Sequence, residues 1–334
     1  FWQDDSAIIF KLQHLQGPAG SFGEGIIGSG PYKYLISFFV LFFPFFKLEP
    51  FYYFLVGFLS YLVVVFVFSF LAKELFKNTK NTERKVAVFF ATLVFAAGYV
   101  GSDIMFRISN SWQSNLGLTL AILSFTFFIK SIKERNKKLV YYLLSLSLFL
   151  ASTEFVYVRS HSLIFPILAM DILIAGCQLK IGKILLTVLR QIPFWLIFYV
   201  RYLKGESMGS SALTKIINDL LHGKFEILTG LIATIGNGFV PDVLQAHFIK
   251  FFPSKFNLLY LLLFVIITWV IFSFFKLDKS KKYLATAFLF LGYLLNRYFI
   301  GQDLYWYRTK EAFIAGASGI YASIFLIFLT VFLW

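Results

Sequence analysis

Long apolar segments separated by short charged loops limit what this chain can fold into more than any other feature. A bilayer core of roughly 30 Å requires about 17–25 apolar residues in one helix. Because lipid offers no hydrogen-bond partners, such segments must satisfy their own backbone groups, as helices do. We therefore predict an all-α polytopic integral membrane protein. Nine segments have this length or nearly so: 51–72, 86–101, 114–132, 139–158, 163–177, 184–200, 257–275, 283–300 and 313–334.

The composition supports a membrane protein and excludes several other classes. Of the 334 residues, 59% are hydrophobic and only 14% are charged, whereas a soluble domain carries about 25% charged residues. A soluble enzyme, a nucleic-acid-binding module and a disordered chain are therefore excluded. The lone Cys177 excludes a disulfide framework and a cysteine-based metal cluster. Since the chain starts at Phe1 and ends in an apolar run at Trp334, we expect it to be incomplete at both ends.

Lysine and arginine gather in alternate loops, which predicts an orientation. Loops 73–85, 130–138, 178–183 and 276–282 hold 16 Lys and Arg in 35 residues. Positively charged loops stay in the cytoplasm, so the remaining loops face outward. The protein is therefore expected in the plasma membrane, with these loops on the extracytoplasmic face: 1–50, 102–113, 159–162, 201–256 and 301–312.

The alternation also predicts the organisation of one transmembrane domain over residues 1–334. An outer first loop with juxtamembrane helices (1–50) precedes six spans (51–200), an outer loop with interfacial helices (201–256) and three more spans (257–334). Segment 34–46 is apolar but would break the alternation if it spanned, so we predict that it lies in the interface. Leu213, Ile216, Ile217, Leu220 and Leu221 form an apolar stripe typical of a helix on a membrane surface.

Adjacent carboxylates stand near the start of the chain, in Trp2-Gln3-Asp4-Asp5. Capping of the helix that follows is one interpretation, because acidic side chains accept hydrogen bonds from free amides at a helix start. The alternative is a general base held at the outer surface. The sequence leaves both interpretations open.

Further polar residues lie at the predicted outer surface. Glu154 stands near the outer end of an apolar helix, followed by Arg159 and His161. It either reaches the interface and pairs with Arg159 or orients a substrate. Tyr307 and Arg308 precede the last span, where Arg308 either anchors the helix at the interface or holds a lipid phosphate.

Two charged residues lie within predicted spans rather than at the outer surface. Asp171 is in the middle of one span, and Arg190 is about a turn or two from the inner end of the next. We predict that they form a structural ion pair between neighbouring helices. The histidines show no metal-ligand spacing.

In order and topology the chain resembles the GT-C superfamily of membrane glycosyltransferases, in particular the branch of the protein O-mannosyltransferases and aminoarabinose transferases. The resemblance rests on the Asp4-Asp5 pair, Pro31-Tyr32-Lys33-Tyr34, Thr153-Glu154 and Tyr307-Arg308. A His expected before Pro31 is missing, and a second outer acid is represented by Asn115, or by Asp103 in its place.

The resemblance implies a transferase that moves a sugar from a polyprenyl-phosphate donor to a glycan, lipid or protein acceptor. Asp4 would be the general base with Asp5 beside it, and Arg308, Arg159, Glu154, Asp103, Tyr307 and His161 would bind substrate or lipid phosphate. No cofactor is identified, and a divalent metal stays open. The alternatives are a transporter or flippase, and an outer-face polymerase or ligase of lipid-linked glycans.

Overall fold

All regular structure in the described part of the chain is helical. The computed structural model describes residues 45–47, 49–77, 80–97, 111–134, 136–155, 164, 167, 168, 171, 181–200, 218 and 221–223. It contains five helices: α4 (Pro50–Leu75), α5 (Asn81–Ala97), α7 (Ser111–Lys133), α8 (Lys138–Phe155) and α10 (Ile181–Phe198). The prediction of an all-α chain is confirmed for these residues.

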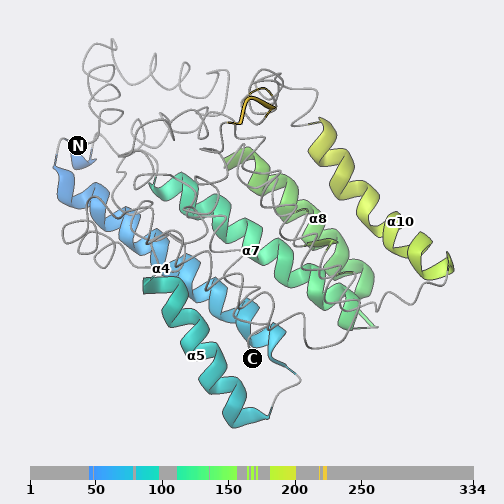
Figure 1. The fold of residues 1–334 in the computed structure, drawn as a ribbon. Coiled ribbons are helices and arrows are strands. Elements are labelled where there is room, and N and C mark those ends of the chain that lie inside the picture. Colours follow the sequence, from blue (N-terminus) through green and yellow to red (C-terminus); the bar gives the residue numbers. More distant parts are fainter. Residues whose placement is uncertain are drawn as a thin grey trace.

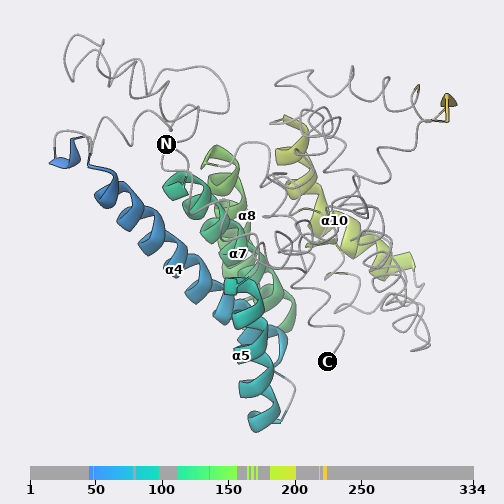
Figure 2. The same cartoon turned by 60° about the vertical axis from the view of Figure 1, so that its left-hand side comes forward.

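The helices form a row of long neighbours (Figures 1 and 2). Helices α4, α7, α8 and α10 follow one another across the row, and α5 lies against α4. Helix α4 runs parallel to α7, because Gly57 lies beside Asn115 while Glu74 lies beside Lys133. Helix α8 runs antiparallel to α7, as a short loop between neighbouring helices requires.

Two of the described helices have the length and composition of membrane spans. They are Pro50–Leu75 and the Asn115–Lys133 part of α7, while Lys138–Thr153 and Leu185–Phe198 are shorter apolar helices. On α4 the face that carries Phe51, Leu59 and Phe66 is exposed, although its residues are as apolar as those facing the bundle. A helix that is apolar all round suits a lipid environment better than water. These helices indicate an association with a membrane.

The chain turns sharply just before α4. Lys47 has a φ of 48°, in the left-handed region, and the Glu49 amide donates to the Phe46 carbonyl at 3.0 Å. This tight turn separates the helical residues 45 and 46 from the helix that begins at Pro50. Pro50 suits the first helical turn because its missing N–H has no intrahelical partner there.

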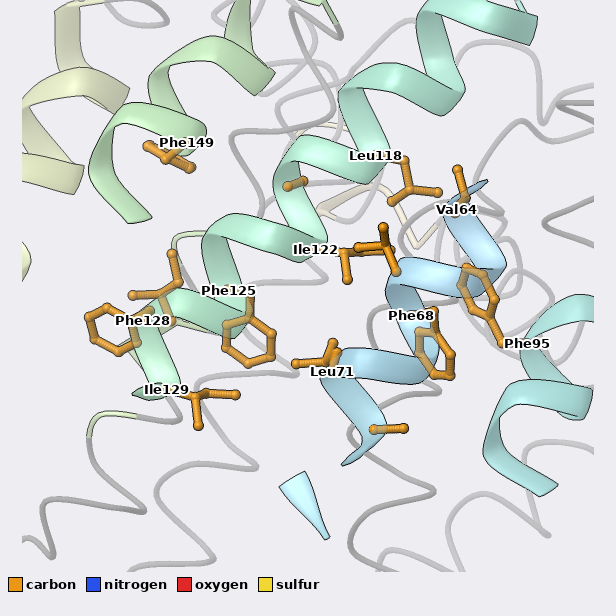
Figure 3. Packing of buried hydrophobic residues seen from close by; sticks show 14 of the residues in the cluster. Val64, Phe68, Leu71, Phe95, Leu118, Ile122, Phe125, Phe128, Ile129 and Phe149 are labelled. Carbon is orange, nitrogen blue, oxygen red and sulfur yellow. The ribbon is translucent and has the colours of Figure 1, made fainter. Parts of the chain in front are cut away.

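The core between the helices is made of large apolar side chains (Figure 3). Val64, Phe68 and Leu71 of α4 face Leu118 and Ile122 of α7 and are nearly or fully buried. On its other side Phe68 stacks on Phe95 of α5, with ring centroids 4.2 Å apart. Buried apolar side chains on α4 recur every three or four residues, which is the spacing that places them on one helical face.

Side-chain hydrogen bonds also join α4 to the neighbouring helices α7 and α5. The Asn115 amide of α7 donates to the Gly57 carbonyl of α4 at 3.2 Å and to the Ser60 hydroxyl at 2.7 Å. The Tyr61 hydroxyl donates to the Ala96 carbonyl at 3.0 Å, which lies in the last turn of α5, where carbonyls lack intrahelical partners.

Helices α7 and α8 are joined by a reciprocal serine pair. The Ser124 hydroxyl donates to the Ser145 carbonyl at 2.7 Å, and the Ser145 hydroxyl donates to the Ser124 carbonyl at 2.8 Å. Both serines are fully buried. Small polar residues at such a contact let two helices approach closely without stranding a polar group in lipid.

The observed helices agree with the first six predicted spans where these are described. Helix α5 starts at Asn81 rather than 86, because its first turn uses the polar residues of the preceding loop. In segment 163–177 the described residues 164, 167, 168 and 171 are helical. Next to the predicted apolar stripe of Leu213–Leu221, the described residues 218 and 221 are helical. Gly223 follows with a φ of 73°, the left-handed conformation typical of a helix C-terminus. The three last predicted spans lie outside the described residues.

Candidate functional site

A buried charged cluster joins Asp171 to α10. The Arg190 guanidinium pairs with the Asp171 carboxylate through Nη2 and Oδ1, and through Nε and Oδ2 at 3.2 Å. The Gln191 amide donates to Asp171 Oδ2 at 2.9 Å. Asp171 is completely buried, and the Arg190 side chain is only 13% exposed. The predicted ion pair between these residues is confirmed.

The position of Arg190 explains why it needs a partner. It is the tenth residue of the 18-residue α10, so at 1.5 Å per residue it lies about 14 Å from the first residue. A charge at this depth of an apolar helix is costly unless it is paired. The two-point contact with Asp171 supplies an opposite charge and fixes the orientation of the guanidinium plane.

Helix α8 contributes to the same cluster through Tyr142. The Tyr142 hydroxyl donates to the Arg190 carbonyl at 2.7 Å. Pro193 stands inside α10 and has no N–H to donate, so it is the Leu189 carbonyl, four residues earlier, that loses its helical partner. The Arg190 carbonyl is the next one along the helix. Tyr142 therefore adds a hydrogen bond between α8 and α10 in the turn that precedes Pro193.

The geometry favours a structural role for this cluster over acid–base chemistry. Both Asp171 oxygens accept hydrogen bonds, and the opposite charge of Arg190 lies against them. Three of the about four acceptor positions of this carboxylate are therefore already used, and its side chain is completely buried. Gln191 Oε1 is buried and has no hydrogen-bond partner among the described residues, which leaves one acceptor open in the cluster.

A second charged cluster lies at the end of the bundle where α4 and α7 end and α8 begins. This is the end predicted to face the cytoplasm. Lys77 Nζ lies 3.5 Å from Glu74 Oε1 and 3.5 Å from Glu134 Oε1. The negative charge of Glu74 raises the pKa of Lys77 most strongly, and the hydrogen bond and charge of Glu134 raise it further. The Lys133 ammonium donates to the Glu74 carbonyl at 2.8 Å. Loops 73–85 and 130–138 therefore meet at one end of the bundle, as the predicted alternation requires.

Most residues of the predicted outer site are not described by the structure. Glu154 belongs to the last turn of α8. Asn115, suggested as a replacement for a second acid, is buried against α4 and uses its amide as a helix contact. The remaining predicted site residues lie outside the described part of the chain: Asp4, Asp5, Asp103, Arg159, His161, Tyr307 and Arg308.

Gln191 and Tyr142 were not predicted as members of the polar cluster. The sequence offers a reason to expect Gln191 there, because a buried amide next to Arg190 in an apolar helix also needs a hydrogen-bond partner. It offers no such reason for Tyr142, which is one of 18 tyrosines and whose partner is a main-chain carbonyl.

Within the described residues no group of three or more His, Cys, Asp or Glu side chains is placed to hold a metal ion. Comparisons with protein-family models, with curated protein sequences and with solved structures gave no match.

Proposed function

We propose that this chain is a membrane glycosyltransferase of the GT-C type, which transfers a sugar from a polyprenyl-phosphate donor to an acceptor at the extracytoplasmic face of the plasma membrane. The observation that carries the proposal is the Trp2-Gln3-Asp4-Asp5 motif in an otherwise strongly apolar, multi-span sequence. The nine-span topology belongs to the same proposal.

The direction of the described helices supports it. The N-termini of α4 and α7 and the C-terminus of α8 lie at one end of the bundle, because α4 is parallel and α8 antiparallel to α7. The chain therefore enters α7 and leaves α8 at the end away from the lysine clusters. In the sequence, the predicted outer loops that contain Asp103, Arg159 and His161 are continuous with these helix ends.

The chemistry assigns distinct roles to the predicted acids and cations. Asp4 takes the proton of an acceptor hydroxyl or amine as the acceptor forms a bond to the anomeric carbon. The bond between that carbon and the phosphate oxygen breaks, and its electron pair leaves on the lipid phosphate. Arg308 and Arg159 stabilise this growing negative charge. One displacement of this kind inverts the anomeric centre.

The Asp171–Arg190 pair favours the transferase over the transporter alternative. Transporters use ionisable residues near the middle of the membrane to bind substrates and coupling ions. Here the Asp171 carboxylate is occupied by Arg190 and Gln191, which suits a fixed contact between helices. The other candidate groups are predicted at one surface.

The proposal is tested by comparing Asp4→Asn and Asp5→Asn with the wild type at equal expression in membranes. Transfer of radiolabelled sugar from a polyprenyl-phosphate donor is measured. Glu49→Gln is the matched control, because Glu49 is exposed and its side chain makes no capping hydrogen bond. We expect Asp4→Asn to lose about 10²–10⁴-fold in rate while Glu49→Gln keeps full activity. Full activity of a folded Asp4→Asn protein would refute Asp4 as the base.

A further inference from the structure

The lysine-rich end of the bundle forms a strongly cationic surface, here called the cationic rim. Its described residues include nine cations and three carboxylates (Glu74, Glu83 and Glu134), drawn from the ends of α4, α5, α7 and α8 and the turns that flank them. The nine cations are Lys73, Lys77, Lys80, Arg84, Lys85, Lys130, Lys133, Lys137 and Lys138. At the opposite end the charged side chains that are described are Lys47 and Glu49, so the excess of positive charge belongs to the rim.

The carboxylates of the rim neutralise only part of this charge. Glu74 and Glu134 share Lys77. Among the described residues, no carboxylate lies within ion-pair distance of Lys80, Lys85, Lys137 or Lys138, and all four are exposed. The first turn of α8 contains no acidic residue, although carboxylates are the residues that stabilise a helix start. The rim therefore carries positive charge that an external anion would stabilise.

Apolar side chains lie directly beside these cations. Lys138 is followed by Leu139 and Val140, which are 68% and 56% exposed. Lys73 lies over the ring of Phe70, 5.3 Å from its centroid, and Phe70 is itself exposed. A ligand that covers this boundary needs a negative charge at one end and a hydrocarbon chain at the other.

We propose that the cationic rim binds the headgroups of anionic phospholipids, with the phosphates on the lysines and the acyl chains along the exposed apolar faces of α4 and α8. Charge complementarity selects an anionic over a zwitterionic lipid, because basic residues at a membrane surface attract acidic headgroups. The adjacent Leu139, Val140 and Phe70 select a lipid over free phosphate. This binding is independent of the proposed transfer reaction.

The test uses the purified full chain in a neutral detergent. Its thermal unfolding is followed during titration with dioleoyl phosphatidylglycerol, with dioleoyl phosphatidylcholine and with glycerol 3-phosphate. We expect stabilisation by phosphatidylglycerol alone, and weaker stabilisation as salt is raised, because screening shortens the reach of exposed charges. Equal stabilisation by phosphatidylcholine would overturn the charge selectivity. Equal stabilisation by glycerol 3-phosphate would overturn the lipid as the ligand.

Variants locate the binding. Lys138→Gln and Lys85→Gln should each weaken the apparent affinity for phosphatidylglycerol about fivefold, which corresponds to about 1 kcal/mol per basic residue. Lys138→Arg keeps the charge and should bind as the wild type does. Lys47→Gln is the control, because Lys47 is exposed at the opposite end. A loss in Lys47→Gln equal to that in the rim variants would overturn the assignment to the rim. Unfolding without lipid shows whether each variant is folded.

Discussion

The Asp171–Arg190 pair allows a double-mutant test of what holds α10 in the bundle. Replacing Asp171 by Leu removes the charge that faces Arg190 and the acceptor of the Gln191 amide. The Arg190 side chain is only 13% exposed. The variant therefore leaves a guanidinium in the apolar interior without its partner.

The expected cost follows from this geometry. Breaking a buried ion pair from one side destabilises a protein by about 3–5 kcal/mol, whereas replacing both partners by apolar residues is often neutral or stabilising. Asp171→Leu and Arg190→Leu alone should each lower the free energy of unfolding by about that amount. The double variant should recover most of it, so that the coupling energy is about 3 kcal/mol or more.

Reversible unfolding in mixed micelles of mild detergent and dodecyl sulfate measures all four proteins. Leu189→Ala is the control, because Leu189 lies next to Arg190 on α10 but is exposed, and it should change stability by less than about 1 kcal/mol. Additive single effects, with no recovery in the double variant, would refute the reasoning that the two charges stabilise the bundle as a pair.

Three smaller predictions concern other contacts. Tyr142→Phe removes the hydrogen bond to the Arg190 carbonyl. It should lower the free energy of unfolding by about 0.6 kcal/mol, the average for such bonds in membranes. No change would show that the bond does not stabilise the turn before Pro193. Ser145→Leu should separate α7 from α8 and cost about 1–3 kcal/mol or more, whereas Ser145→Ala keeps the close approach and should cost less; equal costs would contradict the close contact. The pKa of Lys77 is raised by Glu74, so the ion pairs stabilise the fold below the ordinary lysine pKa of about 10.4 and are lost as pH rises through the higher folded value. Stability curves of the wild type and Lys77→Gln should therefore converge at alkaline pH, and a constant difference at all pH values would contradict the pairing.

The sequence predicted the features that depend on local composition. Apolar length alone located α4, α7, α8 and α10 to within a few residues, because a membrane helix is defined by its hydrophobic run. The Asp171–Arg190 pair was predictable for a related reason, since two opposite charges in adjacent apolar helices each need a partner. The alternation of lysine-rich loops also predicted which helix ends meet.

Features that depend on helix rotation and depth could not be read from the sequence. Asn115 was considered as a replacement for an acid at the outer surface, yet its amide binds Gly57 and Ser60 of α4. Ser124 and Ser145 resemble many other serines until the two helices are placed in register. The helical pattern shows which residues share a face, but the neighbour that each face contacts is set by tertiary packing.

Wild-type protein in sealed membrane vesicles of both orientations distinguishes a transferase from a flippase. A radiolabelled polyprenyl-phosphate sugar is supplied to the outer leaflet together with a mixture of acceptors, and release of free polyprenyl phosphate is followed. We expect release coupled to sugar transfer only in vesicles whose extracytoplasmic face is outward. Transfer only in inverted vesicles would contradict the predicted orientation, and movement of the intact donor across the membrane without release would show a flippase instead of a transferase.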